Sequence, residues 1–265
     1  MGQALGEDTF DFIVIGSGAA GLVGAITASR RGLRPLIIEK ADHWGGTTAT
    51  SGGVLWVPGN DLMAAQGEPD SAADARAYVH ALIGEDADER QVSKADAFLE
   101  NAPQMARMLG EEGVSWIRSS DHPDYYPGTR GHGKGRTLES APLDGRKLGP
   151  QFETMRLSEL DMPAIHSGQF GTLTRTWTSF GLFLEGARTA IGHKLRTLVG
   201  QKPLGNGRAL AASLMRIVIR RGIPVRLSTR LVELVVEQGS VTGVIVESGG
   251  VRERIEAPAG VLFAA

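Results

Sequence analysis

Three glycines and one acidic residue near the amino terminus have the types and spacing of a site for phosphate and ribose. Gly16, Gly18 and Gly21 follow the apolar run FIVI at 12–15, and Glu39 comes 18 residues after Gly21. Glycines permit a tight turn and let the backbone approach a pyrophosphate closely, and an acid about 20 residues later can accept hydrogen bonds from ribose hydroxyls. This spacing predicts dinucleotide binding.

The neighbouring sequence predicts the strand, helix and second strand that such a site requires. The run at 12–15 reads as a buried strand, Gly21 lets the following helix pack closely on it, and 36–38 reads as a second strand. The helix N-terminus would direct unpaired N–H groups and a partial positive charge at the phosphates. A GxGxxG motif alone is weak in a chain with 36 glycines, and the alternative is an ordinary βαβ unit with a glycine-rich turn. The residues of this fingerprint that we expect to bind the dinucleotide are Gly16, Ser17, Gly18, Ala19, Ala20, Gly21, Glu39 and Lys40.

The composition excludes several other classes of function. A net charge of −2 without a basic stripe provides no electrostatic footprint for nucleic acids. The absence of cysteine excludes disulfides, Cys-ligated zinc or iron–sulfur clusters, and a catalytic thiol. We expect no metal, because HExxH-like spacing is missing among the six histidines, at 43, 80, 122, 132, 166 and 193.

One uncharged stretch, 12–29, is long enough to be taken for a membrane span on hydropathy. Four glycines interrupt it, and the fingerprint explains its apolar character as a buried parallel strand followed by a buried helix. A signal peptide needs a positive amino-terminal region, whereas Glu7, Asp8 and Asp11 are acidic. We therefore expect no membrane span and a cytoplasmic protein.

Apolar periodicity and turn residues predict the elements that follow. Helices are expected at 71–84, 89–110 and 204–221, with 151–200 mostly helical. Loops are expected at 43–60 and 119–150, and short strands at 114–117, 225–227 and 261–263. Three further strands, separated by glycine-containing turns, form a β-meander at 231–236, 241–246 and 251–255.

The position of this meander favours an FAD-binding variant of the Rossmann fold over a plain nicotinamide-binding domain, by analogy between folds. We expect an α/β fold of the glutathione-reductase type, with residues 1–265 forming one FAD-binding domain. Within it, 1–60 would hold the βαβ unit and flavin loop, 61–203 a helical and loop insertion, and 204–265 a helix, a strand, the meander and a final strand.

Seven segments carry a resemblance to a known family: GSGAAG at 16–21, IIEK at 37–40, GGTTATSGGVLWVPGN at 45–60, DYYPG at 124–128, GR at 135–136, GRKLG at 145–149 and GNGRAL at 205–210. With them the chain resembles the flavoproteins of fumarate reductase and succinate dehydrogenase, and within that family the 3-ketosteroid Δ1-dehydrogenases. The resemblance covers almost the whole chain, and SGGVLWVPGN and YYPG narrow it most.

The resemblance implies FAD as the cofactor. It also implies additional FAD-binding residues, namely Gly45, Gly46, Thr47 and Thr48 by the phosphates, Ser51, Gly52 and Gly53 near the flavin ring, and Leu231, Ala264 and Ala265. The small and hydroxyl residues agree with this reading because they let backbone N–H groups reach an anion; a polar surface turn is the alternative. Succinate dehydrogenases attach flavin to a histidine whose place is occupied here by Gly46, so the resemblance implies non-covalent FAD.

The resemblance also implies that Tyr125 or Tyr126 faces a hydrophobic ketone substrate and is catalytic. A free tyrosine has a pKa of about 10, so a tyrosine base needs a neighbour that lowers its pKa or relays the proton. The alternative is that both rings pack a proline-rich loop. Trp56, beside the flavin loop, is more simply explained by packing.

Relatives in this family are longer and continue into a substrate-binding cap domain, which we expect to be absent here. A fragment, one subunit completed by a second polypeptide, and a cofactor-binding remnant are all compatible with that expectation. The expected reaction is dehydrogenation of the carbon–carbon bond next to the carbonyl of a 3-ketosteroid or similar ketone. The alternatives are a fumarate-reductase-like enoate reductase and a non-catalytic dinucleotide-binding module.

Overall fold

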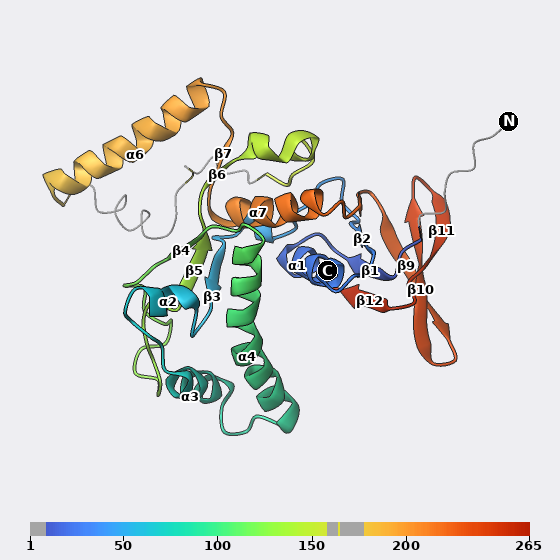
Figure 1. The fold of residues 1–265 in the computed structure, drawn as a ribbon, viewed down its shortest axis with the longest axis horizontal. Coiled ribbons are helices and arrows are strands. Elements are labelled where there is room, and N and C mark those ends of the chain that lie inside the picture. Colours follow the sequence, from blue (N-terminus) through green and yellow to red (C-terminus); the bar gives the residue numbers. More distant parts are fainter. Residues whose placement is uncertain (1–8, 158–163, 165–177) are drawn as a thin grey trace. The chain divides into compact units, whose positions relative to one another are not determined.

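The computed structural model describes residues 9–157, 164 and 178–265, and the fold is shown in Figure 1. Contacts within the chain divide it into two compact units. The first unit comprises 1–50, 145–160 and 211–265, and the second comprises 51–144 and 161–210. The assignment of residues 1–265 to one domain, with internal boundaries at 60 and 203, stays a prediction.

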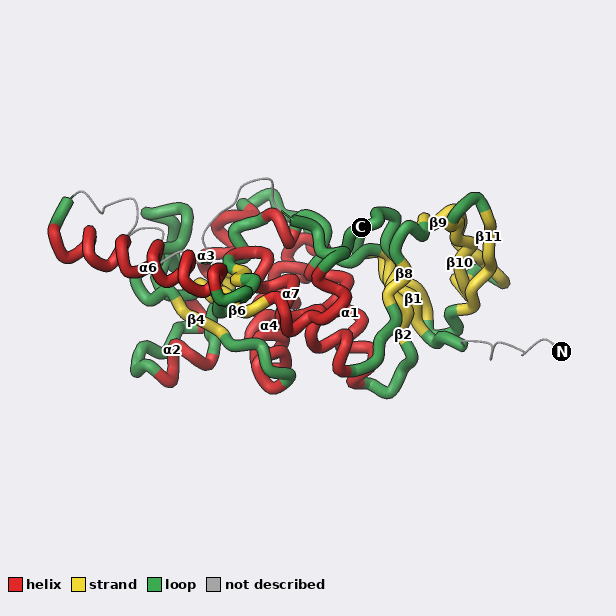
Figure 2. The backbone as a smooth tube through the Cα atoms, turned by 90° about the horizontal axis from the view of Figure 1, so that it is seen from above, coloured by secondary structure: helices red, strands yellow, loops and turns green. Residues whose placement is uncertain are grey.

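The first unit contains a parallel sheet and an antiparallel meander, which Figures 1 and 2 show next to each other. The parallel sheet has the order β12-β1-β2-β8, and the meander has the order β11-β10-β9. Helix α1 connects β1 to β2 and contacts both strands. This arrangement confirms the expected α/β fold with a parallel sheet and a β-meander. The elements are β1 (Phe12–Ile15), α1 (Ala19–Arg30), β2 (Pro35–Ile38), η1 (Thr48–Thr50), η2 (Gly145–Phe152), β8 (Val225–Arg226), β9 (Arg230–Glu237), β10 (Ser240–Ser248), β11 (Val251–Glu256) and β12 (Gly260–Phe263).

Apolar side chains from the parallel sheet and the meander form one core. Strand β2 is buried along its whole length, as is usual for a parallel strand covered on both faces. Val244 and Val246 of the meander pack in the same cluster as Ile13, Ile15 and Leu36 of the sheet. Burial of this apolar area holds the sheet edge in place, and the site described below lies at that edge.

The second unit is built around a small antiparallel sheet with the order β3-β5-β4. Val57, Ala102, Ala106 and Leu138 form its buried apolar cluster. Helix α7 (Asn206–Arg220) begins in this unit and continues in the first. The other elements are β3 (Val54–Trp56), α2 (Asp61–Ala65), α3 (Ala72–Ile83), α4 (Glu89–Glu111), β4 (Trp116–Arg118), β5 (Thr137–Ser140), β6 (Leu143–Asp144), α6 (Phe180–Leu198) and β7 (Pro203–Leu204).

Two of the expected loops contain strands, and this part of the prediction was wrong. Strand β5 lies within 119–150 and β3 lies within 43–60, and the two pair with each other. All four residues of β5 are buried although three of them are polar, so apolar periodicity could not reveal this strand. The helices expected at 71–84, 89–110 and 204–221 are α3, α4 and α7, although Leu204 belongs to strand β7.

Other elements expected from the sequence agree in part with the structure. The three strands of the meander lie within a few residues of their expected positions. The strand expected at 114–117 is β4, which begins two residues later and ends one residue later. The segment expected to be mostly helical contains α6, whereas 158–163 and 165–177 lie outside the described residues. Within the described ranges, no helix combines the length and the hydrophobicity needed to cross a membrane. The same ranges hold no cluster of acidic, histidine or cysteine side chains arranged for a metal ion.

Replacing Gly21 by alanine should destabilise the first unit. A Cβ at this position would lie 2.0 Å from the carbonyl oxygen of Gly16, and the backbone cannot move aside as a side chain could. We expect a loss of about 1–3 kcal/mol or more in the free energy of unfolding, measured by urea denaturation.

Gly192→Ala is the matched control, since Gly192 is also a helical glycine but a Cβ there would meet no atom of the described residues within 4 Å. It should leave stability unchanged or raise it by up to about 1 kcal/mol. Equal stability of the two variants would contradict the close approach of α1 to the turn.

Candidate functional site

Three parallel strands end at the same level and define the edge at which the site forms. Ile15 pairs with Ile38 of β2 on one side and with Phe263 of β12 on the other. Strand β1 leads through α1 to β2, whereas β12 lies on the opposite side of β1, so the strand order reverses at β1 while all strands stay parallel. Ligands of open parallel sheets bind outside the carboxyl ends of the strands at such a point.

The turn after β1 requires a glycine. Gly16 has a φ of +103°, and a Cβ there would lie 2.8 Å from the carbonyl oxygen of Ala264. The Ala264 amide in turn donates to the carbonyl of Ile15 at 2.9 Å. The chain after β12 therefore crosses directly beside the turn, and only a residue without a side chain fits between them.

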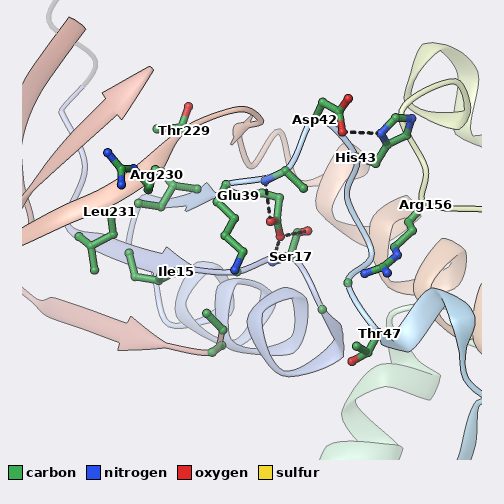
Figure 3. A pocket seen from close by; sticks show the side chains of 18 of the residues that line it. Ile15, Ser17, Glu39, Asp42, His43, Thr47, Arg156, Thr229, Arg230 and Leu231 are labelled. Atoms are coloured by element: carbon green, nitrogen blue, oxygen red, sulfur yellow. Dashed lines mark hydrogen bonds and ion pairs between the residues drawn. The ribbon is translucent and has the colours of Figure 1, made fainter. Parts of the chain in front are cut away.

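Glu39 connects the turn with the loop that follows β2. Its Oε2 accepts hydrogen bonds from the amide (3.0 Å) and the hydroxyl (2.6 Å) of Ser17, and its Oε1 accepts one from the amide of Ala41 (3.0 Å). Figure 3 shows these contacts. A carboxylate has about four acceptor positions. Oε1 can therefore accept one more hydrogen bond, from a ligand in the cavity that Glu39 lines.

The hydroxyl of Ser17 also orders the glycine-rich loop. It accepts a hydrogen bond from the amide of Gly45 at 3.1 Å, and the Ser17 side chain is almost completely buried. Thr48 of the same loop accepts from the amide of Ala19 at 2.9 Å. The N-cap residue of α1, Gly18, offers no side-chain hydrogen bond, and the first turn carries no acidic residue. The partial positive charge at this helix end therefore remains available to an anion.

These segments surround a cavity of about 1020 Å³, at the upper end of the range for cofactor and small-molecule sites. Figure 3 shows Glu39 and Ser17 between Arg230 and Leu231 on one side and His43 and Arg156 on the other. Sequence-predicted residues that line the cavity are Gly16, Ser17, Gly18, Glu39, Lys40, Gly46, Thr47, Leu231, Ala264 and Ala265.

Other predicted cofactor residues do not line this cavity. Within the first unit these are Ala19, Ala20, Gly21, Gly45 and Thr48. Ser51, Gly52 and Gly53 belong to the second unit, where a Cβ on Gly53 would lie 2.5 Å from the backbone of Asn206. The amide of Gly207 donates to the carbonyl of Ser51 at 3.0 Å. A role of these three residues near the flavin ring stays a prediction.

Tyr125 and Tyr126 also lie in the second unit, in the loop before β5. Their side chains are 77% and 59% exposed. Exposure leaves the phenols accessible to a substrate. The catalytic assignment of either residue stays a prediction.

Several cavity residues were missed by sequence reasoning. Arg156 and Met155 follow η2, more than a hundred residues from the fingerprint. Thr229 lies just before the meander, and Arg230 is the first residue of its strand β9. An isolated bridge between Trp44 and Met155 brings the first pair beside the glycine-rich loop. Spacing along the chain carries no signal for such contacts. Asp42 and His43 also line the cavity, and their 2.7 Å contact lowers the pKa of the Asp42 carboxyl.

Comparison with known proteins assigns the family. The FAD binding domain family matches residues 11–265. This chain belongs to that family. A 3-oxosteroid 1-dehydrogenase of Mycolicibacterium smegmatis is 36% identical over 246 residues, which cover 89% of the chain and 42% of the relative. A 4-oxocyclohexanecarboxylate 2-dehydrogenase of Sinomonas cyclohexanicum is 31% identical, covering 97% of the chain and 43% of the relative.

A solved structure shows the same architecture. The crystal structure of a 3-ketosteroid Δ1-dehydrogenase from Sterolibacterium denitrificans, in complex with 1,4-androstadiene-3,17-dione, has a TM-score of 0.84 at 29% identity and covers 97% of this chain and 48% of that one. The chain thus spans less than half the length of each of these relatives. The matches confirm the predicted resemblance to the ketosteroid dehydrogenase branch and identify FAD as the cofactor.

The residues at the sheet edge fit this cofactor. Gly16 and Gly18 leave the backbone bare along the turn, the first turn of α1 carries no acidic side chain, and Glu39 retains an acceptor position. Cationic groups that suit a diphosphate line the same cavity, namely Lys40, Arg156 and Arg230. The fit depends on the backbone geometry of the turn and on one buried carboxylate.

Ser17→Ala should weaken the site by removing two buried hydrogen bonds and leaving the amide of Gly45 without its acceptor. We expect a loss of about 1–3 kcal/mol in stability, with weaker FAD retention. Equilibrium unfolding and the flavin absorbance that co-elutes in gel filtration measure the two effects.

Thr50→Ala is the control for Ser17→Ala, because among the described residues the exposed Thr50 hydroxyl bonds only to the carbonyl of Thr47. Its expected cost is below about 0.5 kcal/mol. If both variants lose the same stability, the network around Ser17 does not organise the turn.

Proposed function

We propose that this chain is the FAD-binding part of a flavin-dependent dehydrogenase that forms a carbon–carbon double bond next to the carbonyl of a 3-ketosteroid or similar cyclic ketone. The observation that carries the proposal is the 36% identity to a 3-oxosteroid 1-dehydrogenase over 89% of the chain. The Sinomonas relative supports the broader substrate class, because its name also describes dehydrogenation of a ring with an oxo group.

The first unit would hold the adenosine and diphosphate end of FAD. Amides of the turn at Gly16–Gly18 and the N-terminus of α1 would bind the diphosphate, and Oε1 of Glu39 would accept a hydrogen bond from a ribose hydroxyl. Ser17 and Ala41 would keep the Glu39 carboxylate oriented through their donors. Non-covalent attachment is part of the proposal, since Gly46 stands where succinate dehydrogenases have their flavin-linked histidine.

The second unit would contribute the proton-transfer group. Dehydrogenation removes a proton from the carbon beside the carbonyl and a hydride from the next carbon, and the two bonding electrons left by the proton form the new double bond. FAD, when bound, supplies the acceptor for that hydride. Tyr125 or Tyr126 would take or hold the proton, because both phenols are exposed on a loop whose backbone is hydrogen-bonded to Tyr78 of α3. The remaining parts of the reaction site would come from sequence beyond the shared half or from a second polypeptide.

The natural protein that carries this chain should be purified with its full sequence and tested for turnover. We expect a yellow protein whose flavin spectrum survives gel filtration and which reduces an artificial electron acceptor when given a 3-ketosteroid or an oxocyclohexane compound. Turnover of fumarate with reduced donors, and of no ketone, would instead indicate an enoate reductase. A colourless protein that binds adenine nucleotides only would indicate a non-catalytic module.

Tyr125→Phe and Tyr126→Phe identify the proton-transfer residue. Loss of a general base or acid lowers kcat by about 10²- to 10⁴-fold, so one of the two variants should show that loss. Its flavin spectrum and thermal stability should stay unchanged, because both side chains are exposed. Wild-type kcat in both variants and in the double variant would remove the tyrosines from the proposal.

A further inference from the structure

The loop that carries Tyr125 and Tyr126 is anchored by a buried cluster of charges. Arg136, at the end of the loop, is 2% exposed. Its Nε lies 3.0 Å from Oδ2 of Asp70 and its Nη2 lies 3.0 Å from Oδ1 of the same residue. Its Nη1 lies 2.7 Å from Oδ2 of Asp124. One guanidinium thus connects two carboxylates, and the side chains of all three residues are almost completely inaccessible to water.

Asp124 immediately precedes the two tyrosines and is held at several points. Its Oδ1 accepts from the indole N–H of Trp56 at 2.6 Å, and its Oδ2 accepts from the amide of Gly133 at 2.9 Å as well as from Arg136. Its own amide donates to the carbonyl of Gly133 at 2.9 Å. The entry and exit of the loop are therefore joined across Asp124.

The loop also packs tightly against α3. The amide of Tyr126 donates to the hydroxyl of Tyr78 at 3.1 Å, and Tyr78 is buried. A Cβ on Gly131 would lie 2.0 Å from the carbonyl oxygen of Asp74, so the loop backbone contacts the α3 backbone directly. Asp70, just before this helix, also accepts from the amide of Gly59 at 2.9 Å. The cluster thus connects Asp70, just before α3, with Arg136, just before β5.

The anchoring contrasts with the exposure of the tyrosine side chains. Ion pairs without access to water lose solvation, and packing a surface loop does not require them, since apolar side chains of similar volume serve as well or better. A charged cluster instead fixes the geometry of the groups that it joins, because the planar guanidinium of an arginine sets the orientation of two carboxylates. Burial lowers the pKa of Arg136, but the hydrogen bonds and charges of Asp70 and Asp124 outweigh it, so the net shift is upward and the guanidinium stays charged.

We propose that Arg136, with Asp70 and Asp124, positions the Tyr125–Tyr126 loop for proton transfer with the ketone substrate. The inference rests on the function proposed above and assigns positioning residues to it. Arg136 acts through the loop and does not itself contact the substrate.

The test compares Arg136→Lys with Arg107→Lys in the full natural protein. Both changes keep the positive charge and remove an arginine fork bound to an aspartate, because Arg107 makes the same two contacts with Asp61 on an exposed surface. Arg136→Lys should lower kcat by roughly 10- to 100-fold, as expected for a misplaced catalytic group. KM and flavin content should change little, and Arg107→Lys should behave as wild type.

Hydrogen exchange supplies a readout that does not depend on activity. Amides of 124–133 should exchange about tenfold faster in Arg136→Lys than in wild type, whereas those of α4 should keep their protection. If Arg136→Lys does not fold, Asp70→Asn replaces it, with Asp61→Asn as its exposed control. Unchanged exchange in the folded variant would overturn the proposal.

A double-mutant cycle separates positioning from a structural role. In the Tyr125→Phe/Tyr126→Phe background, the effect of Arg136→Lys on kcat should fall below about twofold, because the groups being positioned are gone. An undiminished loss in that background, or wild-type kcat with faster exchange, would overturn the proposal. Absence of ketone turnover in the wild type is a different result: it overturns the proposed function and, with it, this use of the loop.

Discussion

The carboxylate of Glu39 holds together the segments on which the cofactor site depends. Through Ser17 and Ala41 it connects the turn after β1 with the loop after β2, and the Ser17 hydroxyl extends this network to Gly45. A nearly buried carboxylate is stable only when donors compensate for its lost hydration. The three donors provide that compensation, and they leave one acceptor position on a residue that lines the cavity. The acid is therefore both a structural centre and the expected ribose ligand.

The glycines of the turn act through the same geometry. Gly16 adopts a positive φ against the chain after β12, and Gly21 allows α1 to approach the turn. Each position excludes a side chain for a reason of backbone contact, independent of any ligand. A bare backbone and a helix N-terminus whose N-cap residue has no side chain are the consequence, and both favour a bound diphosphate. Packing requirements and cofactor chemistry thus select the same residues.

In the second unit, the backbone of the loop that carries the exposed Tyr125 and Tyr126 is anchored. The polar contacts that anchor this loop join residues far apart in the sequence. Arg136 and Asp70 are separated by 66 positions, and Trp56 and Asp124 by 68. Nothing in the local sequence marks Asp70 as the partner of Arg136. The motif YYPG identified the loop by resemblance, whereas the cluster beneath it became apparent only in the folded chain.

The sequence by itself determined the local elements whose causes are local. The apolar run at 12–15, the glycines and the acid at position 39 specified a strand, a turn, a helix and a second strand, because backbone freedom and side-chain periodicity act over a few residues. Tertiary structure decided the rest. Strand β5 is polar yet buried, and Arg156 and Arg230 reach the cavity from distant segments. Their positions follow from sheet order, register and long-range packing, and these depend on contacts that spacing along the chain does not encode.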